Sequence, residues 1–143
     1  METNCRTTAF SSLALVPIRL VLGIIFVAHG GQKLFGLFGG DGFAATVESF
    51  AKMGFLPSTF WAGLVGGVEF FGGIALILGF LTQPIALFIA IEMVVATLWR
   101  ISKNHPFVSG YELDLTLALL GFVLATSGGG IYALDNLWPF IYY

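Results

Sequence analysis

Residues 60–81 read FWAGLVGGVEFFGGIALILGFL, an apolar run in which Glu69 is the only charged side chain. A helix of roughly 20 apolar residues is long enough to cross the hydrocarbon core of a bilayer. The run therefore predicts a membrane-spanning helix. Small residues around Glu69 are spaced so that a second helix can approach closely beside the carboxylate. These helix-packing candidates are Gly63, Gly66, Gly67, Gly72 and Gly73.

Three further apolar runs accompany this one along the chain. Together they predict spans over about residues 13–34, 60–81, 84–101 and 111–127. Between the first two spans, Phe43, Val47 and Phe50 recur at near-helical spacing with charged side chains between them, which favours a short amphipathic helix at the membrane surface. The fold class expected is an all-α integral membrane protein. It is a four-transmembrane-helix bundle in one domain over residues 1–143, with a short amphipathic interfacial helix between helices 1 and 2.

The composition agrees with a lipid environment and excludes several kinds of site. Of the 143 residues, 57% are hydrophobic and 10% are charged, whereas about 25% are charged in a soluble domain. A net charge of −2 provides no basic field for nucleic acid. Cys5 is the only cysteine, so an intrachain disulfide, a dithiol pair and a cysteine-based metal site are excluded. No metal and no covalently bound cofactor is predicted.

The ionisable residues inside the spans are the candidate functional residues, because such groups usually face the bundle interior or a cavity. Depth follows from the ~1.5 Å rise per helical residue. Arg19 and Glu92 fall ~9 Å and ~12 Å in from the face that holds both termini, which predicts an interhelical pair. Glu69 and His29 fall ~13 Å and ~8 Å in from the opposite face. A candidate polar pocket on that side comprises His29, Lys33, Glu69 and Glu112.

Two interpretations of these groups stay open. They can be interhelical fasteners that specify which helices pack, without any chemistry. Alternatively they line a pocket for a quinone or another small substrate, in which a desolvated carboxyl group or His29 exchanges protons near neutral pH. No catalytic residue is assigned.

The distribution of basic residues predicts an orientation. Lys33, Lys52, Arg100 and Lys103 lie at or near the loops on one side, whereas Arg6 and Arg19 lie toward the other. Basic residues are enriched on the cytoplasmic side of membrane proteins. The count favours both termini outside the cytoplasm.

Several short motifs are spread over about residues 17–136. They are Arg19-Leu20-Val21-Leu22-Gly23, His29-Gly30-Gly31-Gln32-Lys33-Leu34-Phe35-Gly36, Phe38-Gly39-Gly40-Asp41-Gly42, Glu69-Phe70-Phe71-Gly72-Gly73 and Gly110-Tyr111-Glu112. In these motifs the chain resembles the DoxX family of small four-helix bacterial membrane proteins. Its polar residues stand at the family's characteristic polar positions. These residues are Arg19, His29, Lys33, Glu69 and Glu112.

The resemblance implies a multi-pass protein of the bacterial cytoplasmic (inner) membrane that is tied to redox metabolism. A relative is the membrane subunit of a thiosulfate:quinone oxidoreductase. The function it implies is a quinone-interacting or anchoring subunit of a membrane oxidoreductase, with quinone as the cofactor to look for. The alternatives are a non-catalytic accessory subunit of a larger membrane complex and a small-solute transporter. The expected partners are the lipid bilayer and either further copies of the chain or other redox subunits.

Overall fold

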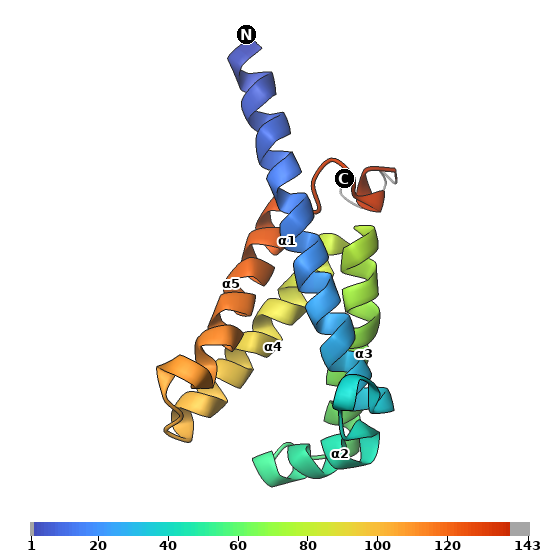
Figure 1. Ribbon diagram of the computed structural model, residues 1–143, viewed down its shortest axis with the longest axis vertical. Coiled ribbons are helices and arrows are strands. Elements are labelled where there is room, and N and C mark those ends of the chain that lie inside the picture. The colour runs from blue at the N-terminus through green and yellow to red at the C-terminus, as the bar shows by residue number, and fades with distance from the viewer. Residues whose placement is uncertain (1, 138–143) are drawn as a thin grey trace. The chain divides into compact units, whose positions relative to one another are not determined.

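A computed structural model describes residues 2–137, with side chains from residue 13 onward. Figure 1 shows long helices joined by short turns. The helices are α1 (Glu2–Phe35), α2 (Gly42–Met53), α3 (Ser58–Leu78), α4 (Thr82–Ser102) and α5 (Glu112–Ser127). Shorter helical turns occupy Leu37–Gly39, Phe107–Tyr111 and Leu134–Leu137. No strand occurs within residues 2–137.

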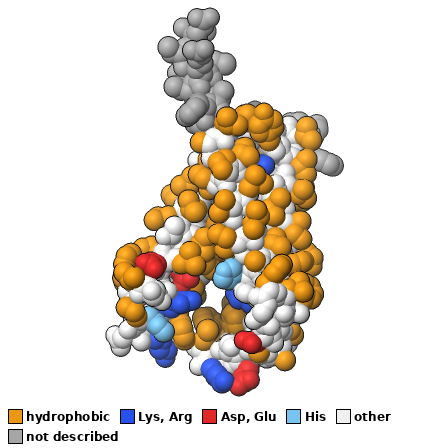
Figure 2. Space-filling model, viewed as in Figure 1, with side chains coloured by type: hydrophobic (Ala, Val, Ile, Leu, Met, Phe, Trp, Pro, Cys, Tyr) orange, Lys and Arg blue, Asp and Glu red, His pale blue; other side chains and the backbone are white. Residues whose placement is uncertain are grey.

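The helical segments confirm the predicted fold class. Four of them are long and apolar enough to cross a membrane, and the short helix α2 lies between the first two along the chain. The candidate spans are Leu13–Phe35, Ser58–Leu78, Thr82–Ser102 and Phe107–Ser127. Figure 2 shows hydrophobic side chains along these helices, as lipid contact requires. The chain is therefore an all-α membrane protein.

The helix ends differ by a few residues from the predicted ends. The link between α3 and α4 consists of residues 79–81, not of Thr82 and Gln83, which belong to α4. Gly79 has a φ of 72° and Leu81 a φ of 49°. The left-handed conformation of Gly79 ends α3 early, because glycine adopts it without steric penalty. Pro84 still lies in the first turn of α4, where a missing N–H breaks no intrahelical hydrogen bond.

The described chain forms two compact units, residues 23–74 and the remainder, and each is described here by itself. The predicted single-domain organisation stays a prediction. In the unit of residues 23–74, α1 and α3 run antiparallel with their backbones in contact. A methyl group on Gly73 would lie 2.7 Å from the Val27 nitrogen, and one on Gly30 would overlap the Phe70 backbone. Glycine is what permits this approach, as in other membrane helix pairs.

The packing glycines predicted from the sequence do not all have close neighbours. A methyl group on Gly66 would come within 2.7 Å of the Leu34 side chain. One on Gly63 would only reach the Phe43 ring at 4.0 Å, and one on Gly67 would meet nothing within 4 Å. Gly72 is buried. Gly30 belongs to the same interface, although the sequence did not single it out as a packing residue.

The α2 helix is attached to the end of α1. Gly40 packs against Gln32, since a methyl group there would lie 2.5 Å from the Gln32 Cα. The Thr46 hydroxyl lies 3.1 Å from the Lys33 carbonyl oxygen, which it reaches from the first turns of α2. On the exposed side of α2, Glu48 and Lys52 form an ion pair of 2.7 Å, and this contact lowers the pKa of Glu48. Figure 1 shows α2 turned across the ends of α1 and α3.

The other unit contains α4 and α5 as an antiparallel pair, side by side in Figure 1 and joined through Phe107–Tyr111. Gly121 faces α4, and a methyl group on it would lie 3.1 Å from the Ala86 carbonyl oxygen and 3.2 Å from the Ala90 side chain. Small side chains therefore set the separation of this pair too. The same helices contribute most of the buried apolar side chains of the unit, among them Ile89, Met93, Leu117 and Leu124.

The contrast between Gly73 and Gly67 provides a test of the α1–α3 contact. We expect Gly73→Ala to destabilise the protein by about 1–3 kcal/mol, because the added methyl group overlaps backbone atoms. Gly67→Ala is the matched control, and it should be neutral or stabilise slightly through helix propensity. Reversible unfolding in detergent measures both. Equal effects of the two variants would contradict the described contact.

Candidate functional site

A buried ion pair joins α1 and α3 in the unit of residues 23–74. The Nζ of Lys33 lies 2.5 Å from Oε1 of Glu69. Glu69 is 1% exposed, and Lys33 is half-buried at the end of α1. The antiparallel helices bring the two residues together, and Gly66 leaves room for the neighbouring Leu34 side chain, which would lie 2.7 Å from a methyl group there. Two of the four predicted pocket residues thus meet.

The second oxygen of the Glu69 carboxylate differs from what is expected of a purely structural ion pair, in which every buried polar atom has a hydrogen-bond partner. Oε2 is buried and has no hydrogen-bond partner among the described residues. Leaving a buried acceptor unsatisfied costs about 1–3 kcal/mol, and more where the group is charged. A ligand that donates a hydrogen bond to Oε2 would recover part of this free energy.

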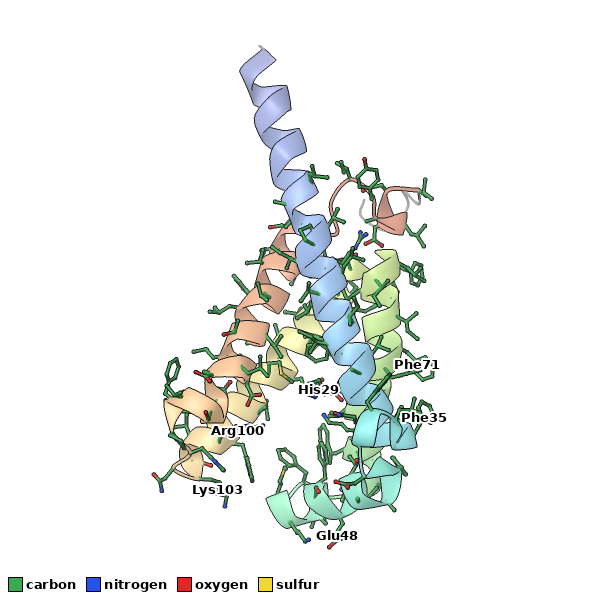
Figure 3. All side chains as sticks on the ribbon, viewed as in Figure 1. His29, Phe35, Glu48, Phe71, Arg100 and Lys103 are labelled. Atoms are coloured by element: carbon green, nitrogen blue, oxygen red, sulfur yellow. The ribbon has the colours of Figure 1, made fainter. Side chains whose placement is uncertain are left out.

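His29 lies one helical turn before Lys33 on α1, and its side chain is exposed. Figure 3 labels it on that helix. Residues four apart share one helix face, so His29 and Lys33 are neighbours along α1.

Glu112 belongs to the other unit, so its grouping with His29, Lys33 and Glu69 stays a prediction. Its Oε1 accepts a hydrogen bond of 2.9 Å from the Ser109 backbone N–H. The carboxylate thereby stabilises the turn that precedes α5, where Ser109 has a φ of 60°. Glu112 is half-buried.

Asp114 is the buried acidic residue of α5, at 8% exposure. Its Oδ2 forms an ion pair with Nε of Arg100 on α4 at 2.7 Å. Nη1 of Arg100 donates a hydrogen bond to the Gly110 carbonyl oxygen at 3.2 Å. The sequence analysis did not join these two residues. The pair links α4 to α5 near their connecting loop.

Arg19 is buried at 3% exposure, in the unit that contains α4 and α5. Nη1 donates to the Gly129 carbonyl oxygen at 2.9 Å, and Nη2 donates to the Tyr132 carbonyl oxygen at 3.3 Å. Its observed hydrogen bonds therefore go to backbone carbonyl groups. Glu92 is half-buried on α4, and its pairing with Arg19 stays a prediction.

Asp135 is a structural residue that sequence reasoning missed. Its carboxylate accepts hydrogen bonds from the backbone N–H groups of Leu81 and Thr82, at 2.7 Å and 3.0 Å. A contact across more than fifty residues leaves no local pattern in the sequence. An aspartate at a helix start is a familiar capping signal only when it directly precedes the helix.

Removing one partner of the Lys33–Glu69 pair should destabilise the protein more than removing both. Lys33→Met leaves the Glu69 carboxylate buried without its ammonium partner, for which a loss of about 3–5 kcal/mol is typical. We expect Lys33→Met and Glu69→Leu each to destabilise the protein strongly, and the double variant to lose clearly less than the sum. Reversible unfolding in detergent provides all of these values.

The exposed pair Glu48–Lys52 serves as the matched control, because water already solvates both partners. The corresponding variants Lys52→Met and Glu48→Leu should each change the free energy of unfolding very little, and their effects should be additive. Additive losses at Lys33 and Glu69 would contradict the coupling that the geometry indicates.

The comparisons with known proteins agree with this architecture. The sequence model of the DoxX family matches residues 14–101, more than half of the chain. A Bacillus subtilis (strain 168) protein named "Putative oxidoreductase CatD" is 31% identical over 125 residues, covering 87% of this chain and 84% of the relative. "Inner membrane protein YqjF" of Escherichia coli (strain K12) is 32% identical over 130 residues, covering 87% and 92%.

An uncharacterized membrane protein of Mycobacterium tuberculosis is 32% identical over 136 residues, covering 86% of this chain and 80% of the relative. No solved structure matches the chain. The four apolar helices and these relatives identify a multi-pass protein of the bacterial inner membrane. With a family match over most of its spans and relatives that align along nearly its whole length, the chain belongs to the DoxX family.

Proposed function

We propose that this protein is a redox-associated membrane subunit that binds a quinone headgroup at the Lys33–Glu69 pair. The observation that carries the proposal is the buried Oε2 of Glu69, which has no hydrogen-bond partner among the described residues. A hydroquinone hydroxyl group is a donor of the kind this acceptor lacks. The similarity to a relative named an oxidoreductase supports a redox role.

The chemistry of the pair suits both redox forms of such a ligand. The Lys33 ammonium group is a hydrogen-bond donor for a quinone carbonyl oxygen, and the Glu69 carboxylate is an acceptor for a hydroquinone hydroxyl group. Binding of the reduced form places a proton-accepting group within hydrogen-bond reach of the hydroxyl, which is the first requirement for a general base. His29, one turn away on α1, is suited to pass that proton onward. A partner subunit would supply the electron acceptor.

Quinone binding to the purified protein in nanodiscs tests the proposal. A short-chain hydroquinone is titrated under reducing conditions while quenching of intrinsic tryptophan fluorescence is followed, and the lipid extract of the purified protein is examined for native quinone. Glu69→Gln keeps the shape of the side chain but removes its charge, and it should weaken hydroquinone binding at least tenfold. Glu48→Gln, on the exposed face of α2, is the control and should bind like the parent protein.

The amount of folded protein separates loss of binding from loss of fold. Unlike Glu69→Leu, Glu69→Gln keeps an oxygen that accepts the hydrogen bond from Lys33 Nζ, so it should accumulate to near-parent levels and elute as a single species in gel filtration. Unchanged hydroquinone affinity in this folded variant would refute the site.

The remaining functions expected from the sequence lead to different results. An accessory subunit would co-purify with a stoichiometric partner and carry no quinone. A small-solute transporter would support uptake in proteoliposomes that depends on the residues of the spans. An obligate homo-oligomer would keep its mass in nanodiscs at the lowest protein-to-lipid ratio.

A further inference from the structure

The segment that follows α5 folds back onto the α3–α4 turn and onto Arg19 of its own unit. We define residues 128–136 as the C-terminal strap. The backbone N–H of Asp135 donates to the Gly79 carbonyl oxygen at 2.9 Å, in the turn between α3 and α4. The Asp135 carboxylate then accepts from the N–H groups of Leu81 and Thr82. The strap thus holds the α3–α4 turn by three hydrogen bonds.

The bonds to the Asp135 carboxylate provide hydrogen-bond acceptors that the residues next to the start of α4 do not. The first N–H groups of any helix have no intrahelical acceptor. Leu81 stands at the N-cap position with a φ of 49° and has no side-chain oxygen to offer. A carboxylate at a helix start also interacts favourably with the helix dipole. Asp135 is therefore the N-terminal cap of α4, supplied from a distant part of the chain.

The other attachment of the strap is Arg19 on α1. Its guanidinium group donates to the carbonyl oxygens of Gly129 and Tyr132, so both ends of the strap are held. The two glycines beside it leave the required space. A methyl group on Gly79 would overlap Nη1 of Arg19, and one on Gly129 would lie 2.7 Å from both the Ala133 side chain and the Thr82 hydroxyl oxygen.

Apolar burial contributes little to this attachment. Ala133 is 5% exposed, but the larger apolar side chains of the strap, Ile131 and Leu134, remain exposed. The strap is held mainly by hydrogen bonds. Such bonds replace bonds to water made in the open state, so their net contribution is only about 0.5–1.5 kcal/mol each, or 1.5–3 where one partner is charged.

The closed strap also leaves two buried polar atoms unsatisfied. Nε of Arg19 and Oγ1 of Thr82 have no hydrogen-bond partner among the described residues. Each such atom costs about 1–3 kcal/mol while it stays buried. Opening the strap would let water reach both atoms, which offsets part of the hydrogen bonding that opening removes.

From these contacts we infer that the C-terminal strap is a clasp that joins α1 to the α3–α4 turn and opens as one cooperative element while the helices stay folded. In the closed state it covers Arg19 and caps α4. It also provides much of the wall of a hollow of about 310 Å³, whose lining includes Gln83, Ser127, Asp135 and Asn136. Opening exposes a buried cation and removes this wall. The device does not depend on quinone binding at Glu69.

Hydrogen exchange of the full-length protein in nanodiscs, followed by mass spectrometry, tests the clasp. Asp135→Ala should raise exchange at least tenfold both in peptides covering residues 79–83 and in those covering the strap. Arg19→Gln should produce the same two increases although it touches only the strap carbonyls. The double variant should exchange no faster than the faster single variant, because one release already frees both attachments.

Two further variants make the result specific. Asn136→Ala is the matched control, since the Asn136 side chain donates only to Gly130 and Ile131 within the strap, and it should leave residues 79–83 protected. Asp135→Asn keeps one carbonyl acceptor and should be intermediate. Slow exchange of residues 79–83 in Asp135→Ala, or in Arg19→Gln, would overturn the inference. Loss of protection in α5 together with the strap would overturn it as well, because the opening would then be global unfolding.

Discussion

The absence of water from the hydrocarbon core is the constraint on which the described structure depends. An ionised side chain there must find a partner within the protein, and a helix end must find a cap. The spans satisfy this requirement through contacts with other helices and with the strap. Lys33 meets Glu69 between α1 and α3, Arg100 meets Asp114 between α4 and α5, and Arg19 is held by carbonyl groups of the strap. Each polar contact also specifies which segments lie together.

Glycine makes these contacts geometrically attainable. The backbones of α1 and α3 approach closely at Gly30 and Gly73, and the Lys33 ammonium group contacts Glu69 in the same interface. Gly79 and Gly129 do the same for Arg19 in the other unit. Without a hydrophobic force between helices in lipid, close van der Waals packing and buried polar bonds provide most of the association free energy. At Gly30, Gly73, Gly79 and Gly129 the missing side chain is therefore part of the mechanism of packing.

The sequence predicted those features that depend on local patterns. Hydropathy over some twenty residues is enough to place the spans, and near-helical spacing is enough to indicate α2. Lys33 and Glu69 could be grouped by depth, because depth follows from position within a span. The partners of Arg19 could not be predicted, since they are backbone groups more than a hundred residues away. The capping role of Asp135 could not be predicted for the same reason, since the N–H groups that it caps lie more than fifty residues away.

The pairing of Lys33 with Glu69 is the central claim, and a charge exchange tests it most directly. The single variants Lys33→Glu and Glu69→Lys each place two like charges together in the α1–α3 contact, and little folded protein should accumulate. The combined variant restores opposite charges at the same separation. The account predicts that its folded fraction in nanodiscs recovers to at least half that of the parent protein. A combined variant that folds no better than either single variant would contradict it.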